Sequence, residues 1–190
     1  MDALSALFLE PDQTMLRVLT GITLGVALVV AFMLSTIKAD PLQPGTAVPA
    51  LKSVDENGKD VNLDEVLKKG LTLVYFYPKA DTSGCTREAC ALRDKWEDVQ
   101  KAGVAVIGVS MDKPEAQKAF KEKFKLPFTL LADSEGTVVK AFGVSTIRAG
   151  FPKRQSFLVK DGKVVWQDPE VKPETHLENV LKAVADLAKK

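Results

Sequence analysis

The chain of 190 residues is long enough for one domain of about 150 residues plus a further segment. It is 46% apolar and 27% charged, and its net charge of +1 is spread along the sequence, which argues against a nucleic-acid-binding surface. Two cysteines and one histidine cannot supply four ligands, so a zinc site built from these residue types is excluded within one chain.

The N-terminal region contains an uncharged run of 20 residues, 18–37, between Arg17 and Lys38. A helix of that length spans about 30 Å, the thickness of a bilayer core. The run predicts a membrane-directed helix within residues 16–37, either a retained transmembrane anchor or a cleaved signal peptide. In both cases the following domain lies across the membrane from Arg17, outside the cytoplasm, and in the periplasm of a Gram-negative cell.

Residues 1–15 form a short extension whose charged side chains are all acidic, the wrong sign for the start of a signal peptide. If translation begins at Met15, this extension is not made, and Arg17 supplies the basic start. The sequence TIKA at 36–39 is compatible with signal cleavage. The sequence does not choose between the two start sites, or between cleavage and anchoring.

A proline-rich stretch, residues 38–50, predicts an extended linker into a domain of residues 51–190. The turn sequence DENGKD, residues 55–60, predicts a small hairpin, and NLDEVLKKG, residues 62–70, predicts a short capped helix that ends at its glycine.

The remaining residues predict strands that alternate with helices, and the first strand is apolar almost throughout, as in a strand buried on both faces. The predicted strands are 71–77, 104–110, 128–131 and the hairpin 155–167 with its Asp161-Gly162 turn; the predicted helices are 85–102, 114–124, 135–143 and one from Pro173. This order predicts an α/β fold, a thioredoxin-like three-layer α/β/α sandwich preceded by the N-terminal hydrophobic helix.

The only two cysteines, Cys85 and Cys90, lie in YFYPKADTSGCTREACALRD, residues 75–94. A bridge between them closes a loop of six residues, which would stabilise a domain of this size little. A catalytic or redox role is therefore favoured over two inert thiols. We place Cys85 in a strand-to-helix turn, where free N–H groups and the positive end of the helix dipole stabilise a thiolate.

The side chains of Thr82 and Pro78, which both precede Cys85, suit this chemistry. Thr82 can offer its hydroxyl to the sulfur or to a substrate oxygen, and it can also cap the helix. Pro78 has no N–H to donate and closes the pocket with apolar surface.

The stretch PKADTSGCT, from Pro78 to Thr86, fits the P-x-x-x-T-x-x-C motif of peroxiredoxins. The following REAC, with its second cysteine five positions on, resembles the PrxQ (bacterioferritin comigratory protein) subfamily. The resemblance covers roughly residues 42–188. Where the family commonly reads DDTPGC, this chain has Ala80 and Ser83, and no catalytic position is lost.

The resemblance implies a peroxiredoxin-type domain that reduces hydrogen peroxide and organic hydroperoxides with no cofactor and no metal. Cys85 would be the peroxidatic cysteine and Cys90 the resolving cysteine of an intramolecular disulfide, which a thioredoxin-like reductant restores. The two peroxide oxygens would be held by Thr82 and by Arg154, which lies in the stretch RQSFLVKDGKV. Pro78 would lie beside them. The subfamily also implies a monomer.

The residues alone leave alternatives open. Arg154 is also compatible with a solvated charge at a strand edge, and Cys90 with a small buried side chain. Glu88 either tunes the site or only complements the helix N-terminus. His176 is expected at the surface.

Two other functions remain open: a membrane-tethered thiol–disulfide oxidoreductase, and a non-enzymatic thioredoxin-like interaction or folding-helper domain. The oxidoreductases carry Cys-x-x-Cys, whereas four residues intervene here, and they need neither the pair of Thr82 and Arg154 nor Pro78. The reductant and the preferred peroxide are not identified by the sequence.

Helix geometry constrains the implied disulfide. Residues five apart in a helix have Cα atoms roughly 8–9 Å apart and point about 140° away from each other. A disulfide needs Cα atoms about 4.4–6.8 Å apart. Bonding of Cys85 to Cys90 therefore requires the first turns of helix 85–102 to unwind in each cycle.

Overall fold

The computed structural model describes residues 40–147 and 149–189. The predicted N-terminal helix of residues 16–37 and the extension before it lie outside these described residues. Within residues 40–147 and 149–189, none of the helices combines the length and the apolar character needed to cross a bilayer.

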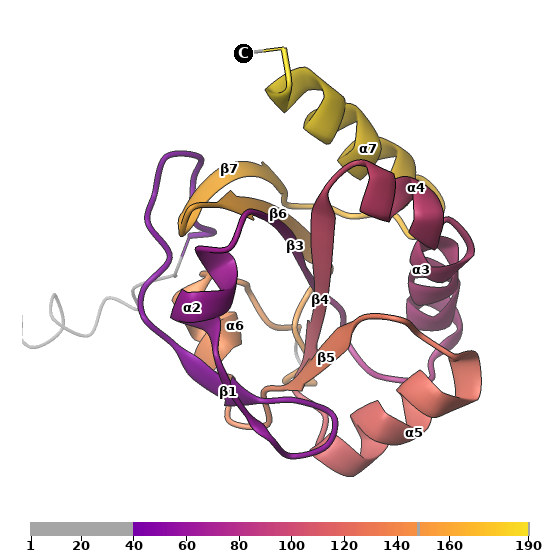
Figure 1. The fold of residues 1–190 in the computed structure, drawn as a ribbon. Coiled ribbons are helices and arrows are strands. Elements are labelled where there is room, and N and C mark those ends of the chain that lie inside the picture. The colour runs from indigo at the N-terminus through magenta and orange to yellow at the C-terminus, as the bar shows by residue number, and fades with distance from the viewer. Residues whose placement is uncertain (1–39, 148, 190) are drawn as a thin grey trace, which may run out of the picture. The chain divides into compact units, whose positions relative to one another are not determined.

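A five-stranded sheet forms the centre of the domain, with the strand order β5-β4-β3-β6-β7 (Figure 1). Strands β3, β4 and β5 run parallel, while β6 runs antiparallel to both β3 and β7. The strands are β3 Leu71–Phe76, β4 Val104–Ser110, β5 Thr129–Ala132, β6 Gln155–Lys160 and β7 Lys163–Asp168. The predicted parallel strands and closing hairpin are confirmed.

The helices and a small hairpin complete the domain. The hairpin consists of β1 Lys52–Val54 and β2 Asp60–Asn62, and the helices are α2 Leu63–Leu67, α3 Ser83–Asp94, α4 Trp96–Lys101, α5 Pro114–Phe124, α6 Thr137–Ala141 and α7 His176–Leu187. Residues 40–50, predicted as a linker, run against the domain, where Leu42 N–H donates to the Phe142 carbonyl and Val48 N–H to the Gly162 carbonyl.

Two apolar cores lie on opposite faces of the sheet, because alternate residues of a strand point to opposite sides. On β3, Leu73 and Tyr75 join the core covered by α3, α4, α5 and α7, whereas Val74 and Phe76 join the core covered by α2 and α6 (Figure 1). This arrangement confirms the three-layer α/β/α sandwich.

The single helix predicted over 85–102 is wrong: the structure has two helices, separated at Lys95. Lys95 has φ −113° and ψ 26°, outside the helical region, so the hydrogen-bond ladder of α3 stops there. The hydrogen bonds of α4 begin at Lys95, whose carbonyl accepts from Val99 N–H at 3.1 Å.

Candidate active site

The loop between β3 and α3 places the predicted nucleophile at a helix start. Pro78 is half-buried in this loop, and Thr82 is the N-cap residue of α3, with extended dihedrals. Cys85 lies in the first turn of α3 and is 1% exposed. The Ala80 N–H donates to the Asp112 carboxylate at 2.7 Å, which ties the loop to the end of β4.

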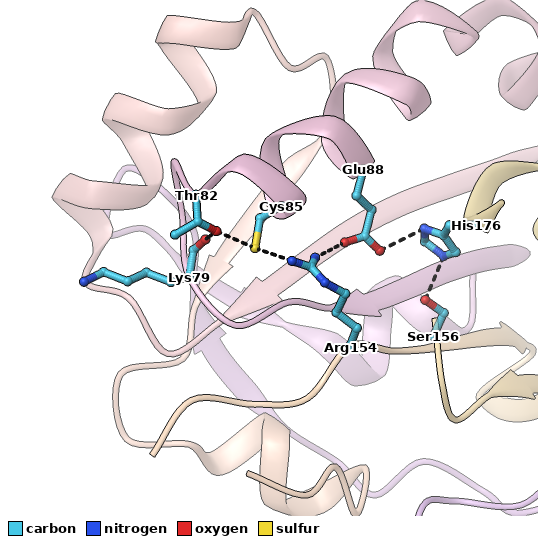
Figure 2. Close-up of polar contacts among 7 residues, drawn as sticks. All are labelled: Lys79, Thr82, Cys85, Glu88, Arg154, Ser156 and His176. Carbon is cyan, nitrogen blue, oxygen red and sulfur yellow. Dashed lines mark hydrogen bonds and ion pairs between the residues drawn. The ribbon is translucent and has the colours of Figure 1, made fainter. Parts of the chain in front are cut away.

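Two side chains contact the Cys85 sulfur (Figure 2). The Thr82 Oγ1 lies 3.0 Å and the Arg154 Nη2 lies 3.1 Å from Cys85 Sγ. Thr82 Oγ1 is also 3.0 Å from the Lys79 carbonyl. A hydroxyl has one proton, so Thr82 donates either to the carbonyl or to the sulfur, and the second arrangement suits a thiolate.

Strand pairing brings Arg154 to this sulfur although 69 residues separate the two in the chain. Phe76, near the end of β3, pairs with Gln155, the first residue of β6, so the preceding Arg154 lies level with the loop after β3. Burial acts to lower the pKa of Arg154, but the negative charges of Glu88 and Cys85 outweigh it and raise the pKa, so the guanidinium stays charged.

A buried polar chain extends from Arg154 to β6. Arg154 Nη1 donates to Glu88 Oε2 at 2.5 Å, and the second oxygen of Glu88 lies 3.0 Å from His176 Nδ1 (Figure 2). This last contact has ion-pair distance but is too bent for a well-aligned hydrogen bond. His176 Nε2 lies 2.8 Å from Ser156 Oγ.

The expectation that His176 lies at the surface is wrong, since it is 1% exposed. It is the first residue of α7, whose buried positions are His176, Val180 and Ala183, at spacings of four and three residues along one helix face. That periodicity is the sequence signal for its burial.

Gly84 makes room for the guanidinium. A Cβ atom on Gly84 would lie 2.8 Å from Arg154 Nη2, closer than side-chain contacts allow. No local sequence pattern points to Gly84, because this requirement depends on a side chain 70 residues away.

Cys90 does not contact Cys85. It is half-buried on the same uninterrupted helix α3, and both cysteines are free thiols. The structure therefore brings Thr82, Cys85 and Arg154 together and leaves Cys90 five helical residues away. Within residues 40–147 and 149–189, no group of three or more His, Cys, Asp or Glu residues is placed to hold a metal ion.

Comparison with known proteins places this site in a family. The sequence model of the AhpC/TSA family matches residues 44–167. A Coxiella burnetii protein named as a peroxiredoxin bcp is 40% identical over 149 residues, which cover 74% of this chain and 97% of that protein. The chloroplastic peroxiredoxin Q of Suaeda salsa is 41% identical over 146 residues, which cover 75% and 68%.

The fold agrees with these relatives. The structure of the Xanthomonas campestris bacterioferritin comigratory protein matches with a TM-score of 0.69 at 27% identity, over 78% of this chain and 99% of that one. The chain belongs to the AhpC/TSA family, and within it to the peroxiredoxins of the PrxQ (bacterioferritin comigratory protein) group. It is a thiol-dependent peroxidase, which is favoured over the oxidoreductase and interaction-domain alternatives.

Proposed function

We propose that Cys85 is the peroxidatic cysteine of this peroxidase. The observation that carries the proposal is the Cys85 sulfur held between the Thr82 hydroxyl and the Arg154 guanidinium, at 3.0 and 3.1 Å. The thiolate attacks the terminal peroxide oxygen, an S–O bond forms as the O–O bond breaks, and the other oxygen takes up a proton and leaves as water or an alcohol. The product on Cys85 is a sulfenic acid.

Thr82 and Arg154 have a second task in this step. The Arg154 Nη2 donates to the sulfur and the Thr82 hydroxyl lies within hydrogen-bond distance of it, so a peroxide oxygen that approaches the sulfur meets the same two groups. These groups orient the O–O bond and stabilise the charge that develops as it breaks. Pro78 adds half-buried apolar surface to the same loop.

Cys90 is the proposed resolving cysteine. Its thiolate attacks the sulfur of the sulfenic acid, the S–S bond forms, and hydroxide leaves and is protonated to water. A thioredoxin-like dithiol then reduces the disulfide and is itself oxidised. The proposed substrates are hydrogen peroxide and organic hydroperoxides; the alkyl peroxide reduction activity of the Xanthomonas campestris relative supports the organic class.

One equivalent of peroxide tests this function directly. Reduced protein is mixed with hydrogen peroxide or an alkyl hydroperoxide, and tryptophan fluorescence is followed in a stopped-flow instrument. Trp96 lies at the start of α4, just after α3, so rearrangement of α3 should change its signal. We expect two thiols to disappear per peroxide consumed. Two intact thiols after the peroxide has been offered would refute the proposal.

Oxidation should unwind the start of α3, because Cys90 cannot reach Cys85 in an intact helix. We expect amides 85–93 to exchange hydrogen on the order of 100-fold faster in the disulfide form than in the reduced form. Amides of α5 serve as the internal control and should not change. Equal protection of 85–93 in both forms, with the disulfide verified by mass, would rule out the unwinding.

Substitution of Gly84 by alanine should lower peroxidase activity without lowering stability. The added Cβ displaces the Arg154 guanidinium, and a shift of about 1 Å at a catalytic group costs roughly 100-fold in rate. Alanine is favoured over glycine in a helix by about 1 kcal/mol, so the thermal midpoint should not fall. Rate constants for peroxide and thermal unfolding curves check this together. A wild-type rate in Gly84→Ala would mean that the guanidinium need not occupy this position.

We further propose that residues 16–37 direct the domain across a membrane, as an anchor or a signal peptide, after an optional extension of residues 1–15. Residues 38–50 then lead into the peroxidase domain of residues 51–190. The apolar run 18–37 supports this placement. Membrane fractionation of cells and determination of the N-terminal residue of the native protein test it. Native protein that is found in the cytosol and keeps this whole segment would refute it.

The remaining proposal concerns assembly: the peroxidase domain acts as a monomer, because α3 carries both cysteines that the cycle needs. Light scattering of the reduced and the oxidised protein tests this. A dimer linked by a disulfide between two chains would contradict it.

A further inference from the structure

Once Cys85 is ionised, the active site holds more negative charges than positive ones. The thiolate and the Glu88 carboxylate are two anions, and both side chains are almost fully buried. Among the described residues, Arg154 is the only permanent cation in contact with them. A buried charge without a partner is costly, so a second positive charge would stabilise this cluster.

His176 is the group placed to provide that charge. Its Nδ1 lies 3.0 Å from one oxygen of Glu88, while Arg154 Nη1 lies 2.5 Å from the other oxygen, so the carboxylate is held between two nitrogen groups (Figure 2). Ser156 holds the far side of the imidazole through Nε2. An imidazolium can donate at both nitrogens: Nε2 lies at hydrogen-bond distance from Ser156, and Nδ1 lies at ion-pair distance from Glu88, where a positive charge is favoured.

Among the described residues, Glu88 is the only charged group paired with His176. Glu88 faces it from α3, and Tyr75 faces it from β3, with ring centroids 5.9 Å apart. Burial raises the pKa of Tyr75 well above its ordinary value, so this phenol stays neutral. Arg154 reaches the imidazole only through Glu88, and the nearby pair of Arg87 and Glu174 is exposed to solvent.

We propose that His176 is a positioning residue that is protonated in the reduced enzyme, where its positive charge balances Glu88 and leaves Arg154 to serve Cys85 and the peroxide. Without that charge, Glu88 attracts the guanidinium alone and competes with the sulfur for it. The inference rests on the peroxidatic role of Cys85 proposed above. With His176 and Ser156 included, the site extends from α3 to α7 and β6.

The protonation state can be read in the wild-type protein, because His176 is the only histidine of the whole chain. Untagged, reduced protein therefore gives a single set of imidazole ring signals in an NMR spectrum. We expect imidazolium signals at neutral pH, and neutral imidazole signals at the same pH in Glu88→Gln. A neutral imidazole in reduced wild type, at a pH where Cys85 reacts rapidly with peroxide, would overturn the proposal.

Kinetics give a second, independent readout. His176→Gln keeps a polar group for Ser156 but cannot carry charge, and we expect its rate constant for Cys85 oxidation to fall about 10- to 100-fold. We also expect the pH profile of that rate constant to lose one ionisation. Tyr75→Phe is the matched control. Tyr75 is buried beside the imidazole, and its hydroxyl has no hydrogen-bond partner among the described residues. The rate constant of this variant should therefore equal that of the wild type.

Four outcomes separate the possibilities. A wild-type rate and pH profile in His176→Gln would overturn the role of His176, and so would an equal fall in Tyr75→Phe, which would indicate a packing effect. If wild type itself fails to lose thiols to peroxide, the proposed function fails instead. If His176→Gln does not fold, the NMR measurement on wild type decides alone.

Discussion

Replacement of Cys85 by serine should reduce peroxide consumption to the uncatalysed background, while replacement of Cys90 by serine should spare the first turnover and abolish the following ones. A serine hydroxyl is hardly ionised near neutral pH and is a weak nucleophile without an adjacent base. The contacts to Cys85 come from Thr82 and Arg154, neither of which is a base at neutral pH. Cys90 contacts none of these groups, so its loss should leave the attack on peroxide intact.

The two variants are best measured side by side. Multiple-turnover assays with an excess of dithiol reductant should show no activity above background for Cys85→Ser. Single-turnover oxidation of Cys90→Ser should proceed at close to the wild-type rate and end in a sulfenic acid, which a mass spectrum detects as one added oxygen. A sulfenic acid on Cys90 in the Cys85→Ser variant would reverse the two roles.

Arg154→Lys should lower the rate constant for Cys85 oxidation by about 10²- to 10³-fold, the cost commonly seen when a preorganised donor to a developing charge is lost. The guanidinium donates from Nη2 to the sulfur and from Nη1 to Glu88 at the same time. A lysine ammonium is a single point charge on a flexible stem and cannot reproduce this fork. We therefore expect that a positive charge alone at position 154 does not support the wild-type rate of Cys85 oxidation.

Arg87→Lys is the matched control for this substitution. Arg87 lies on the same helix α3, but its side chain is exposed and pairs with Glu174 at 3.2 Å. Exposed ion pairs contribute about 0–1 kcal/mol, so this variant should keep both its rate and its stability. If Arg154→Lys retains wild-type kinetics while its structure is intact, Arg154 has no part in the chemistry.

The fold was largely predictable because each strand and helix has its own local pattern. The apolar run of β3, the Asp161-Gly162 turn and the proline at the start of α5 indicate their elements from a few neighbouring residues. The break at Lys95 was missed because neither proline nor glycine marks it. The helical pattern simply continues through that residue.

The candidate site was only partly predictable for a related reason. Thr82 and Cys85 lie three residues apart, and their contact follows from the start of one helix. Glu88 meets Arg154 across 66 residues, and His176 reaches Glu88 from the last helix. No local pattern encodes such contacts; only the packing of α7 and β6 against α3 creates them.

If Cys85 and Cys90 form the proposed disulfide, the helix break at Lys95 limits how much of the protein has to open in each catalytic cycle. The ladder of α3 covers 12 residues and ends before Lys95, whereas α4 begins its own ladder and keeps Val99 in the core. Unwinding from Cys85 toward Cys90 can therefore remain a sub-global opening, with a lower free energy than unfolding of the whole domain. The sheet and the remaining helices then keep their structure through every turnover, ready for α3 to refold once the disulfide is reduced.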